Sequence, residues 1–293
     1  MQSNDQKLAL GTVQFGQFYG IANKLGQVAR TEAKAMLNFA LANSIDTLDT
    51  AIAYGESEDC LGEIGTQGFN LVTKLPGLPK DCKDVANWVR HEVGASLDRL
   101  GITDVYGLLL HRPEQLLGPY GADLYRELQK LKDSGRVNKI GVSIYSPSEL
   151  TLLYSRYSFD LVQAPFNLVD QRFYHSGWLH RLKDDDVEVH TRSAFLQGLL
   201  LMNHEDIPDK FSNWVKLWRT WHRWLSDQDI SAVQACLAFP LSFSEIDRVI
   251  VGANSLSQLS EIVSAANDQR EFNFPDLQCE DENLINPANW TQI

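Results

Sequence analysis

The chain has 293 residues, and its 38 acidic and 26 basic side chains give a formal net charge of −12 at pH 7. A surface this acidic repels the phosphates of nucleic acids and anionic lipid headgroups, and no basic cluster interrupts it, so we expect neither nucleic acid nor membrane as a partner. Hydrophobic residues make up 44% of the chain and charged residues 22%, which excludes a disordered or fibrous protein.

Short β-rich runs alternate with helix-length amphipathic stretches along the whole chain. The predicted strands are residues 8–13, 45–50, 70–75, 105–111, 139–143, 161–164, 187–193 and 248–251. The predicted helices are residues 31–43, 58–64, 85–100, 122–134, 148–157, 177–183, 210–226, 230–241 and 256–266. Eight β-α repeats require parallel strands and favour a closed sheet. The sequence therefore predicts an α/β fold, one (β/α)8 TIM barrel domain over residues 1–293, with an irregular tail from about residue 268.

Signals for export, membrane insertion and metal binding are not found in the sequence. No uncharged apolar run reaches the roughly 18 residues of a membrane span, and the first residues carry neither a basic segment nor a long apolar one. The four cysteines are scattered, and His175, His180 and His190 lack the spacing of metal ligands. We therefore expect a cytoplasmic protein with reduced thiols and no metal site.

Four titratable side chains lie at the ends of three consecutive predicted strands. Asp49 ends the second strand and Tyr54 lies in the loop after it, while Lys74 and His111 lie at the ends of the third and fourth. Because barrel enzymes build their active sites from the C-terminal ends of strands, we expect these groups to meet at one rim. Each alone could be structural, since ion pairs also occur at barrel rims, but four together favour a functional site.

The chemistry of these groups suits activation of a carbonyl oxygen. Tyrosine is a poor acid at pH 7, because its unperturbed pKa is about 10. A neighbouring ammonium, here Lys74 held by Asp49, would lower that pKa, and His111 could donate to the carbonyl oxygen. None of the four is a hydride donor, so reduction of the carbonyl would require a nicotinamide cofactor.

The sequence around these residues resembles the aldo-keto reductase family. Residues 49–58, DTAIAYGESE, are similar to the family segment that carries its aspartate and tyrosine. Lys74 in VTK and His111 in LHRP fall where the family keeps its lysine and histidine. The resemblance runs from about residue 8 to about residue 266, and four such positions in order are a specific signal.

Further segments resemble the family's cofactor-binding segments. They are Gly11-Thr12, IGVS at 140–143 with Gln163, SAFLQGLL at 193–200, and VGANS at 251–255 with Gln258 and Glu261. The cofactor-binding residues that the resemblance implies are Gly11, Thr12, Ser143, Gln163, Arg192, Ser193, Gly252, Ser255 and Gln258.

The resemblance implies an NAD(P)H-dependent oxidoreductase that reduces a small aldehyde, ketone or sugar-like carbonyl to an alcohol. Tyr54 would be the general acid, Lys74 would lower the pKa of that tyrosine, Asp49 would pair with Lys74, and His111 would orient the carbonyl. By the same resemblance the expected partner is a small-molecule carbonyl substrate.

Four positions depart from the family pattern. Ile144 stands where the family usually has asparagine, and Arg192 where many members stack an aromatic ring on the nicotinamide. A guanidinium could stack there, bind an anionic substrate group or form a salt bridge with a nearby carboxylate. Gly252 and Gln258 are neutral where some members place lysine and arginine against the 2′-phosphate, which weakens the case for NADP over NAD. The expected cofactor is NADP, with NAD as a possibility.

Two other functions remain open from the sequence. Lys74 could form a Schiff base in an aldolase-type lyase, although such an enzyme would not need the cofactor segments. The barrel could also bind a nicotinamide cofactor as a regulatory subunit with little turnover. A stripe of tryptophans on one predicted helix face favours core packing over an aromatic wall for the substrate; its members are Trp214, Trp218, Trp221 and Trp224.

Overall fold

Eight parallel strands close into one barrel in the computed structural model, which describes residues 7–268 and 270–291. The strands are β1 (Leu8–Gly11), β2 (Thr47–Asp49), β3 (Asn70–Leu75), β4 (Val105–Leu110), β5 (Val137–Ser143), β6 (Leu161–Pro165), β7 (Glu188–Arg192) and β8 (Arg248–Gly252). Each strand pairs with the next in sequence, and β8 pairs with β1, so the sheet closes on itself. The predicted single-domain (β/α)8 TIM barrel is therefore confirmed.

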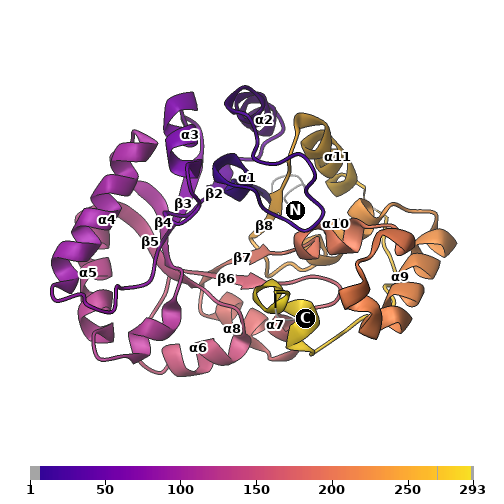
Figure 1. Cartoon of the computed structure of the whole chain (residues 1–293). Helices are drawn as coiled ribbons and strands as arrows, with labels where there is room; N and C mark the ends of the chain where they lie inside the picture. The colour runs from indigo at the N-terminus through magenta and orange to yellow at the C-terminus, as the bar shows by residue number, and fades with distance from the viewer. Residues whose placement is uncertain (1–6, 269, 292–293) are drawn as a thin grey trace.

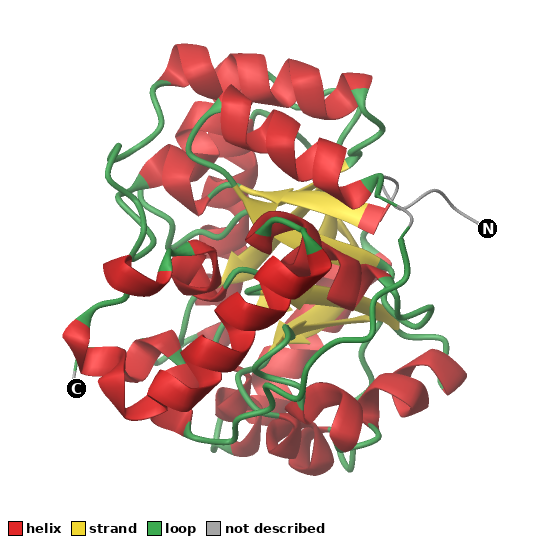
Figure 2. Cartoon of the chain, turned by 90° about the vertical axis from the view of Figure 1, so that its right-hand side faces the viewer, coloured by secondary structure: helices red, strands yellow, loops and turns green. Residues whose placement is uncertain are grey.

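Helices surround the sheet on its outer side, as Figure 1 and Figure 2 show. The α-helices are α1 (Val13–Gly16), α2 (Arg30–Ala42), α3 (Ser57–Ile64), α4 (Val85–Leu100), α5 (Gly121–Asp133), α6 (Pro147–Leu153), α7 (Arg172–His175), α8 (Trp178–Asp184), α9 (Val215–Gln228), α10 (Ala232–Leu241), α11 (Leu256–Ala266) and α12 (Glu282–Ile285). The 3-10 helices are η2 (Pro113–Leu117), η3 (Leu196–Leu201), η4 (His204–Asp206), η5 (Asp209–Trp214) and η6 (Pro287–Asn289). No helix among the described residues is long and apolar enough to cross a membrane.

Local capping sets several helix boundaries. At the start of α4 the Asp84 side chain accepts a hydrogen bond from the backbone N–H of Asn87, and the helix ends at Gly101 in the left-handed conformation. At the start of α10 the side chains of Ser231 and Gln234 each bond the other's backbone N–H, which forms a capping box. These helix boundaries follow from the sequence because the capping groups lie next to them.

Tertiary packing overrides the sequence pattern in the helix predicted over residues 210–226. Its first turn is the 3-10 helix η5, and the α-helix α9 begins only at Val215. Phe211 in this turn is fully buried, and its carbonyl accepts the indole N–H of Trp218 at 3.0 Å. The tighter turn thus brings one aromatic side chain into the core while satisfying the polar atom of another. The helix predicted over residues 148–157 also differs, because α6 ends at Leu153.

The C-terminal segment packs on the barrel beside α7 (Figure 1). Residues 270–281 form neither helix nor strand, and α12 and η6 follow them. The backbone N–H of Cys279 donates to the Val169 carbonyl at 3.0 Å, and Leu284 and Trp290 are buried. The tail predicted to be irregular therefore adds two short helices to the core.

A charged network lies near the N-terminal ends of β4, β5 and β7. The carboxylate of Glu188 accepts hydrogen bonds from the Tyr106 hydroxyl at 2.6 Å and from the Lys139 ammonium. Nε2 of the fully buried His190 lies 2.6 Å from the same carboxylate. Burial raises the pKa of Glu188, but the hydrogen bonds from these three neighbours outweigh it and lower that pKa to about 2.

This network predicts an acid-sensitive contribution to stability. Because the pKa of Glu188 is lower in the folded protein than in the unfolded chain, its contribution is present above about pH 4.5 and is lost as the pH falls through about 2. We expect Glu188→Gln to lower the unfolding free energy at pH 7 by about 2–3 kcal/mol and to flatten its decline below pH 4.5, measured by urea denaturation at several pH values. Glu280→Gln, an exposed control, should keep the parent's pH dependence. Parallel declines in the parent and in Glu188→Gln would contradict the assignment.

Candidate active site

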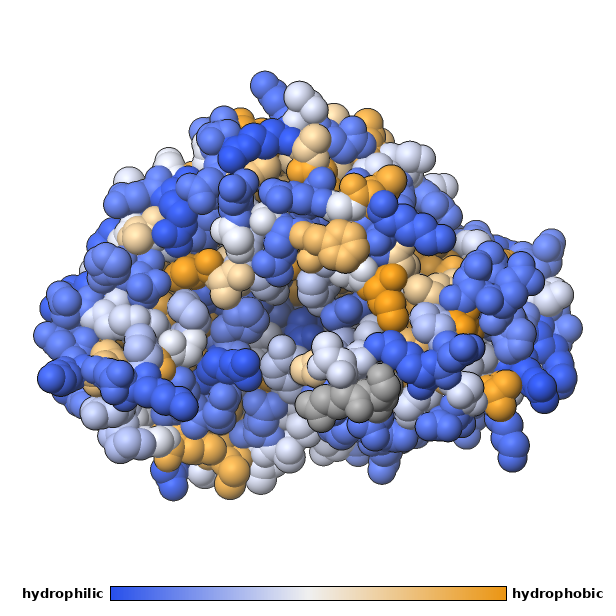
Figure 3. Space-filling view, in the orientation of Figure 1, coloured by the Kyte–Doolittle hydropathy of each residue, from blue (hydrophilic) through white to orange (hydrophobic). Residues whose placement is uncertain are grey.

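A cavity of about 650 Å³ opens at the C-terminal rim of the barrel, where the carboxyl ends of the strands meet. Figure 3 shows it as a hollow near the middle of this face, with hydrophilic side chains at its bottom. Of the four residues predicted to be catalytic, Asp49, Tyr54 and His111 line the cavity, and Lys74 lies beneath it. The expected convergence of three strand ends is therefore seen in the structure.

A buried ion pair joins β2 to β3 under the cavity. Nζ of Lys74 lies 2.6 Å from Oδ1 of Asp49 and donates a second hydrogen bond to the Thr50 carbonyl at 2.9 Å. Only 1% of the lysine side chain and 6% of the aspartate side chain are exposed. Removing either partner would leave the other as a buried charge without compensation, so the two groups hold each other in place.

The same carboxylate connects the pair to β5 and β6. Nε2 of Gln163 donates to Oδ2 of Asp49 at 2.7 Å, and the Ser143 hydroxyl donates to Oε1 of Gln163 at 2.9 Å. A continuous buried chain of hydrogen bonds therefore runs from Lys74 to Ser143 across the barrel rim. Such a fully bonded network fixes each side chain in one orientation.

Close backbone packing holds the loop that carries Tyr54. A Cβ atom on Gly16 of α1 would lie 1.8 Å from the Tyr54 carbonyl oxygen, so only glycine allows this approach. The hydroxyl of Ser57, at the start of α3, donates to the Thr12 carbonyl at 2.9 Å and lies 2.8 Å from the Thr12 hydroxyl. These contacts tie the loop to the end of β1.

The tyrosine and histidine rings meet above the ion pair. Their centroids are 5.9 Å apart and their planes cross at 80°, and Nζ of Lys74 lies 5.1 Å from the centroid of the Tyr54 ring. A phenol and an imidazole therefore line one small volume of the cavity, with the Lys74 ammonium beneath them. This volume could hold a carbonyl oxygen.

Burial sets the protonation of the three groups. It raises the pKa of Tyr54, the Asp49 carboxylate adds to the effect, and the Arg192 guanidinium opposes it, so the phenol keeps its proton at pH 7. Burial and then the charge of Lys74 lower the pKa of His111 to about 4, which leaves the imidazole neutral. Burial also lowers the pKa of Lys74, while Asp49 favours the charged form. A protonated phenol beside a neutral imidazole can donate two hydrogen bonds to one acceptor.

The structure brings most of the predicted cofactor-binding residues into this cavity. Those that line it are Gly11, Thr12, Ser143, Gln163, Arg192, Ser193, Gly252 and Gln258. Ser255 does not line it; its hydroxyl accepts the backbone N–H of Gln258 at 3.2 Å and caps α11. A serine before an amphipathic helix is a common cap, so this role was open to sequence reasoning.

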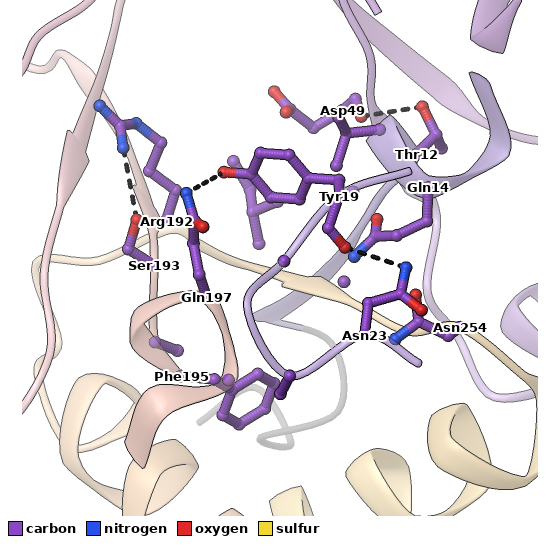
Figure 4. A pocket seen from close by; sticks show the side chains of 18 of the residues that line it. Thr12, Gln14, Tyr19, Asn23, Asp49, Arg192, Ser193, Phe195, Gln197 and Asn254 are labelled. Atoms are coloured by element: carbon purple, nitrogen blue, oxygen red, sulfur yellow. Dashed lines mark hydrogen bonds between the residues drawn. The ribbon is translucent and has the colours of Figure 1, made fainter. Parts of the chain in front are cut away.

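The far part of the cavity holds further polar groups. Oε1 of Gln14 and Oδ1 of Asn254 are buried without a hydrogen-bond partner among the described residues. Both residues line the cavity together with Asn23 (Figure 4), and Glu261 lines it as well. A Cβ atom on Gly252 would lie 2.5 Å from Nε2 of Gln14, so this glycine leaves room for the glutamine. Two unpartnered acceptors and a carboxylate suit a ligand with hydroxyl and amino donors, which fits the adenosine part of a dinucleotide.

Two loops meet over the cavity. The Gln197 side-chain amide donates to the Tyr19 hydroxyl at 3.1 Å, a contact that Figure 4 shows between the loop after β1 and the loop after β7. In the second loop Ser193, Leu196 and Gln197 have positive φ angles of 67°, 46° and 53°. Non-glycine residues adopt this conformation at a cost, and such strain often marks ligand-binding loops.

The tryptophan stripe lies outside the cavity. The indole N–H of Trp221 donates to the Leu200 carbonyl at 3.1 Å, and both Trp218 and Trp221 are buried. No tryptophan is among the described residues that line the cavity. The stripe packs α9 against the body of the barrel. Among residues 7–268 and 270–291, no cluster of three or more His, Cys, Asp or Glu side chains could hold a metal ion.

The polar cavity lies at the C-terminal rim of the barrel, where barrel enzymes have their active sites. A tyrosine, a lysine, an aspartate and a histidine lie in or beneath it. The sequence model of the Aldo/keto reductase family matches residues 7–276. The chain belongs to this family.

Individual relatives agree with this assignment. The chain is 32% identical to a 6-dehydroglucose reductase of Novosphingobium aromaticivorans over 149 residues, 44% of this chain and 48% of that protein. It is 26% identical to the NADH-specific methylglyoxal reductase of Escherichia coli over 198 residues, 61% of this chain and 59% of that protein. The matches thus span about half the length of these curated relatives. The holo form of aldo-keto reductase AKR11C1 from Bacillus halodurans has the same fold, with a TM-score of 0.74, 20% identity, and coverage of 91% of this chain and 88% of that one.

Proposed function

We propose that this protein reduces small aldehydes or ketones to alcohols, with Tyr54 as the proton donor. The observation that carries the proposal is the buried Lys74–Asp49 pair beneath the Tyr54 and His111 side chains, which face one cavity. The names of two relatives, a 6-dehydroglucose reductase and a methylglyoxal reductase, support a small and polar carbonyl substrate.

Each residue has a role in this reaction. A reduced nicotinamide held in this cavity would supply the hydride for the carbonyl carbon. His111, neutral at pH 7, donates a hydrogen bond that holds the carbonyl oxygen, and Tyr54 transfers its proton to that oxygen as negative charge develops there. The resulting phenolate lies near the cations of Lys74 and Arg192, which stabilise it. Ser143 and Gln163 would contact the nicotinamide amide.

Schiff-base chemistry at Lys74 fits the geometry poorly. The amine is 1% exposed and donates to both Asp49 and Thr50. A lyase would need this amine neutral and in contact with the substrate. Its place beneath the cavity favours an electrostatic role.

We expect Tyr54→Phe to lower kcat for aldehyde reduction by about 100- to 10,000-fold, because the variant lacks the acidic proton. Consumption of NADH, followed by its absorbance with a panel of small aldehydes, measures the effect. Tyr120→Phe removes a hydroxyl from an exposed tyrosine outside the cavity and should behave as the parent. Turnover by Tyr54→Phe close to that of the parent would remove Tyr54 from its role.

The far part of the cavity supports NADH over NADPH as the cofactor. Among the described residues that line the cavity, Arg192 is the only lysine or arginine, and it lies near Tyr54. The far part instead presents Glu261 and unpartnered acceptors, which suit the free hydroxyls of a ribose and disfavour a 2′-phosphate.

An added positive charge at the far part of the cavity tests this cofactor preference. Gln258 is exposed on α11 at the edge of the cavity, so Gln258→Arg should improve the affinity for NADPH about tenfold with little change for NADH, because the guanidinium can bind the 2′-phosphate. Quenching of tryptophan fluorescence by each dinucleotide measures both dissociation constants. Ser260→Arg adds the same charge on an exposed position of the same helix outside the cavity and is the matched control. Tighter binding of NADPH than of NADH by the parent would contradict the proposal.

A further inference from the structure

Arg192 differs from the other half-buried arginines of this protein. Arg99 pairs with Glu58 at 2.6 Å, Arg172 with Asp170 at 2.8 Å, and Arg248 with Asp46 at 3.3 Å. Arg192 is also half-buried, yet no carboxylate among the described residues lies within 4.0 Å of its guanidinium. A guanidinium that is partly removed from water without a counter-ion is costly, so its place at the cavity calls for an anionic partner.

Neighbouring groups hold this guanidinium in a fixed position at the cavity. One terminal nitrogen donates to the Ile144 carbonyl at 3.0 Å and the other lies 3.3 Å from the Ser193 hydroxyl. Its carbon lies 4.7 Å from the centroid of the Tyr145 ring. A guanidinium has five N–H donors, and these contacts use two of them. The remaining donors have no partner among the described residues, and the side chain lines the cavity (Figure 4).

The charge of Arg192 acts on the reacting end of the cavity. It opposes the rise in the pKa of Tyr54 and contributes to the lowered pKa of His111, so it lies within electrostatic reach of both side chains. The other cation of this region, Lys74, is already paired with Asp49. Arg192 is thus the uncompensated positive charge beside the place proposed for the carbonyl group.

We propose that Arg192 binds a carboxylate carried by the carbonyl substrate, so that the preferred substrates are aldehyde or keto acids. This inference rests on the proposed reductase function. A guanidinium binds a carboxylate through two parallel hydrogen bonds, which fixes both the position and the orientation of the substrate. A substrate held in this way places its carbonyl oxygen toward Tyr54 and His111.

A pair of aldehydes of equal length tests the proposal. We expect the parent to reduce succinic semialdehyde with a kcat/KM at least about tenfold above that for butanal, because a charged hydrogen-bonded contact is worth this factor or more. In Arg192→Gln this ratio should fall toward one, mainly through a higher KM for succinic semialdehyde. Arg192→Lys should keep part of the preference, and added salt should raise the parent's KM for the anion alone. Arg219→Gln removes an exposed arginine outside the cavity and should keep the parent's ratio.

A binding measurement gives a second readout that needs no turnover. In the presence of NADH, succinate should raise the Tm of the parent more than succinamide does, and Arg192→Gln should lose this difference. Equal kcat/KM values for the two aldehydes in the parent would overturn the proposal. So would a fall of both kcat/KM values in Arg192→Gln that leaves their ratio unchanged. A higher Kd of Arg192→Gln for NADH, with the aldehyde ratio kept, would assign the guanidinium to the dinucleotide instead. Carboxylate binding through Arg192 without reduction of any aldehyde would contradict the reductase function and leave the anion site standing.

Discussion

The buried ion pair between Lys74 and Asp49 is the interaction on which the candidate site depends. Two opposite charges lie 2.6 Å apart with almost no contact with water, a placement that is stable only because hydrogen bonds satisfy both groups. These bonds connect β2 and β3 to β5 and β6 through Gln163 and Ser143. The ion pair therefore aligns four strand ends as well as providing charge.

Burial and nearby charges set the protonation of the side chains above this pair. Burial and then Asp49 raise the pKa of Tyr54 and keep the phenol protonated, although the sequence predicted that Lys74 would lower this pKa; the Arg192 guanidinium opposes the rise. Burial and Lys74 keep His111 neutral, so it donates a hydrogen bond without adding another positive charge. Lys74 thus acts on the pKa of His111, and the Arg192 guanidinium from β7 acts on the pKa of Tyr54.

The sequence predicted the barrel and the meeting of four side chains at its rim, because both follow from position along the strands. Asp49, Lys74 and His111 lie at strand ends, and a closed parallel barrel brings such ends together whatever the details of packing. The roles of Gln14 and Asn254 were not predictable, because an unpartnered acceptor is visible only once its neighbours are placed. The network around Glu188 was missed for a similar reason, since its members come from three strands. The predicted start of α9 was wrong, because the packing of Phe211 turns residues 209–214 into a 3-10 helix. The sequence pattern alone would extend the α-helix over these residues.

The central claim is that this barrel transfers a hydride to a carbonyl carbon while its own tyrosine supplies the proton. Incubation with NADH carrying deuterium on the transferable position of C4 and a short aldehyde acid, followed by mass spectrometry of the product, tests the claim most directly. The account predicts an alcohol with one deuterium on the former carbonyl carbon and with a hydroxyl proton that exchanges with solvent. Recovery of unlabelled aldehyde after long incubation, or an alcohol without deuterium on that carbon, would contradict it.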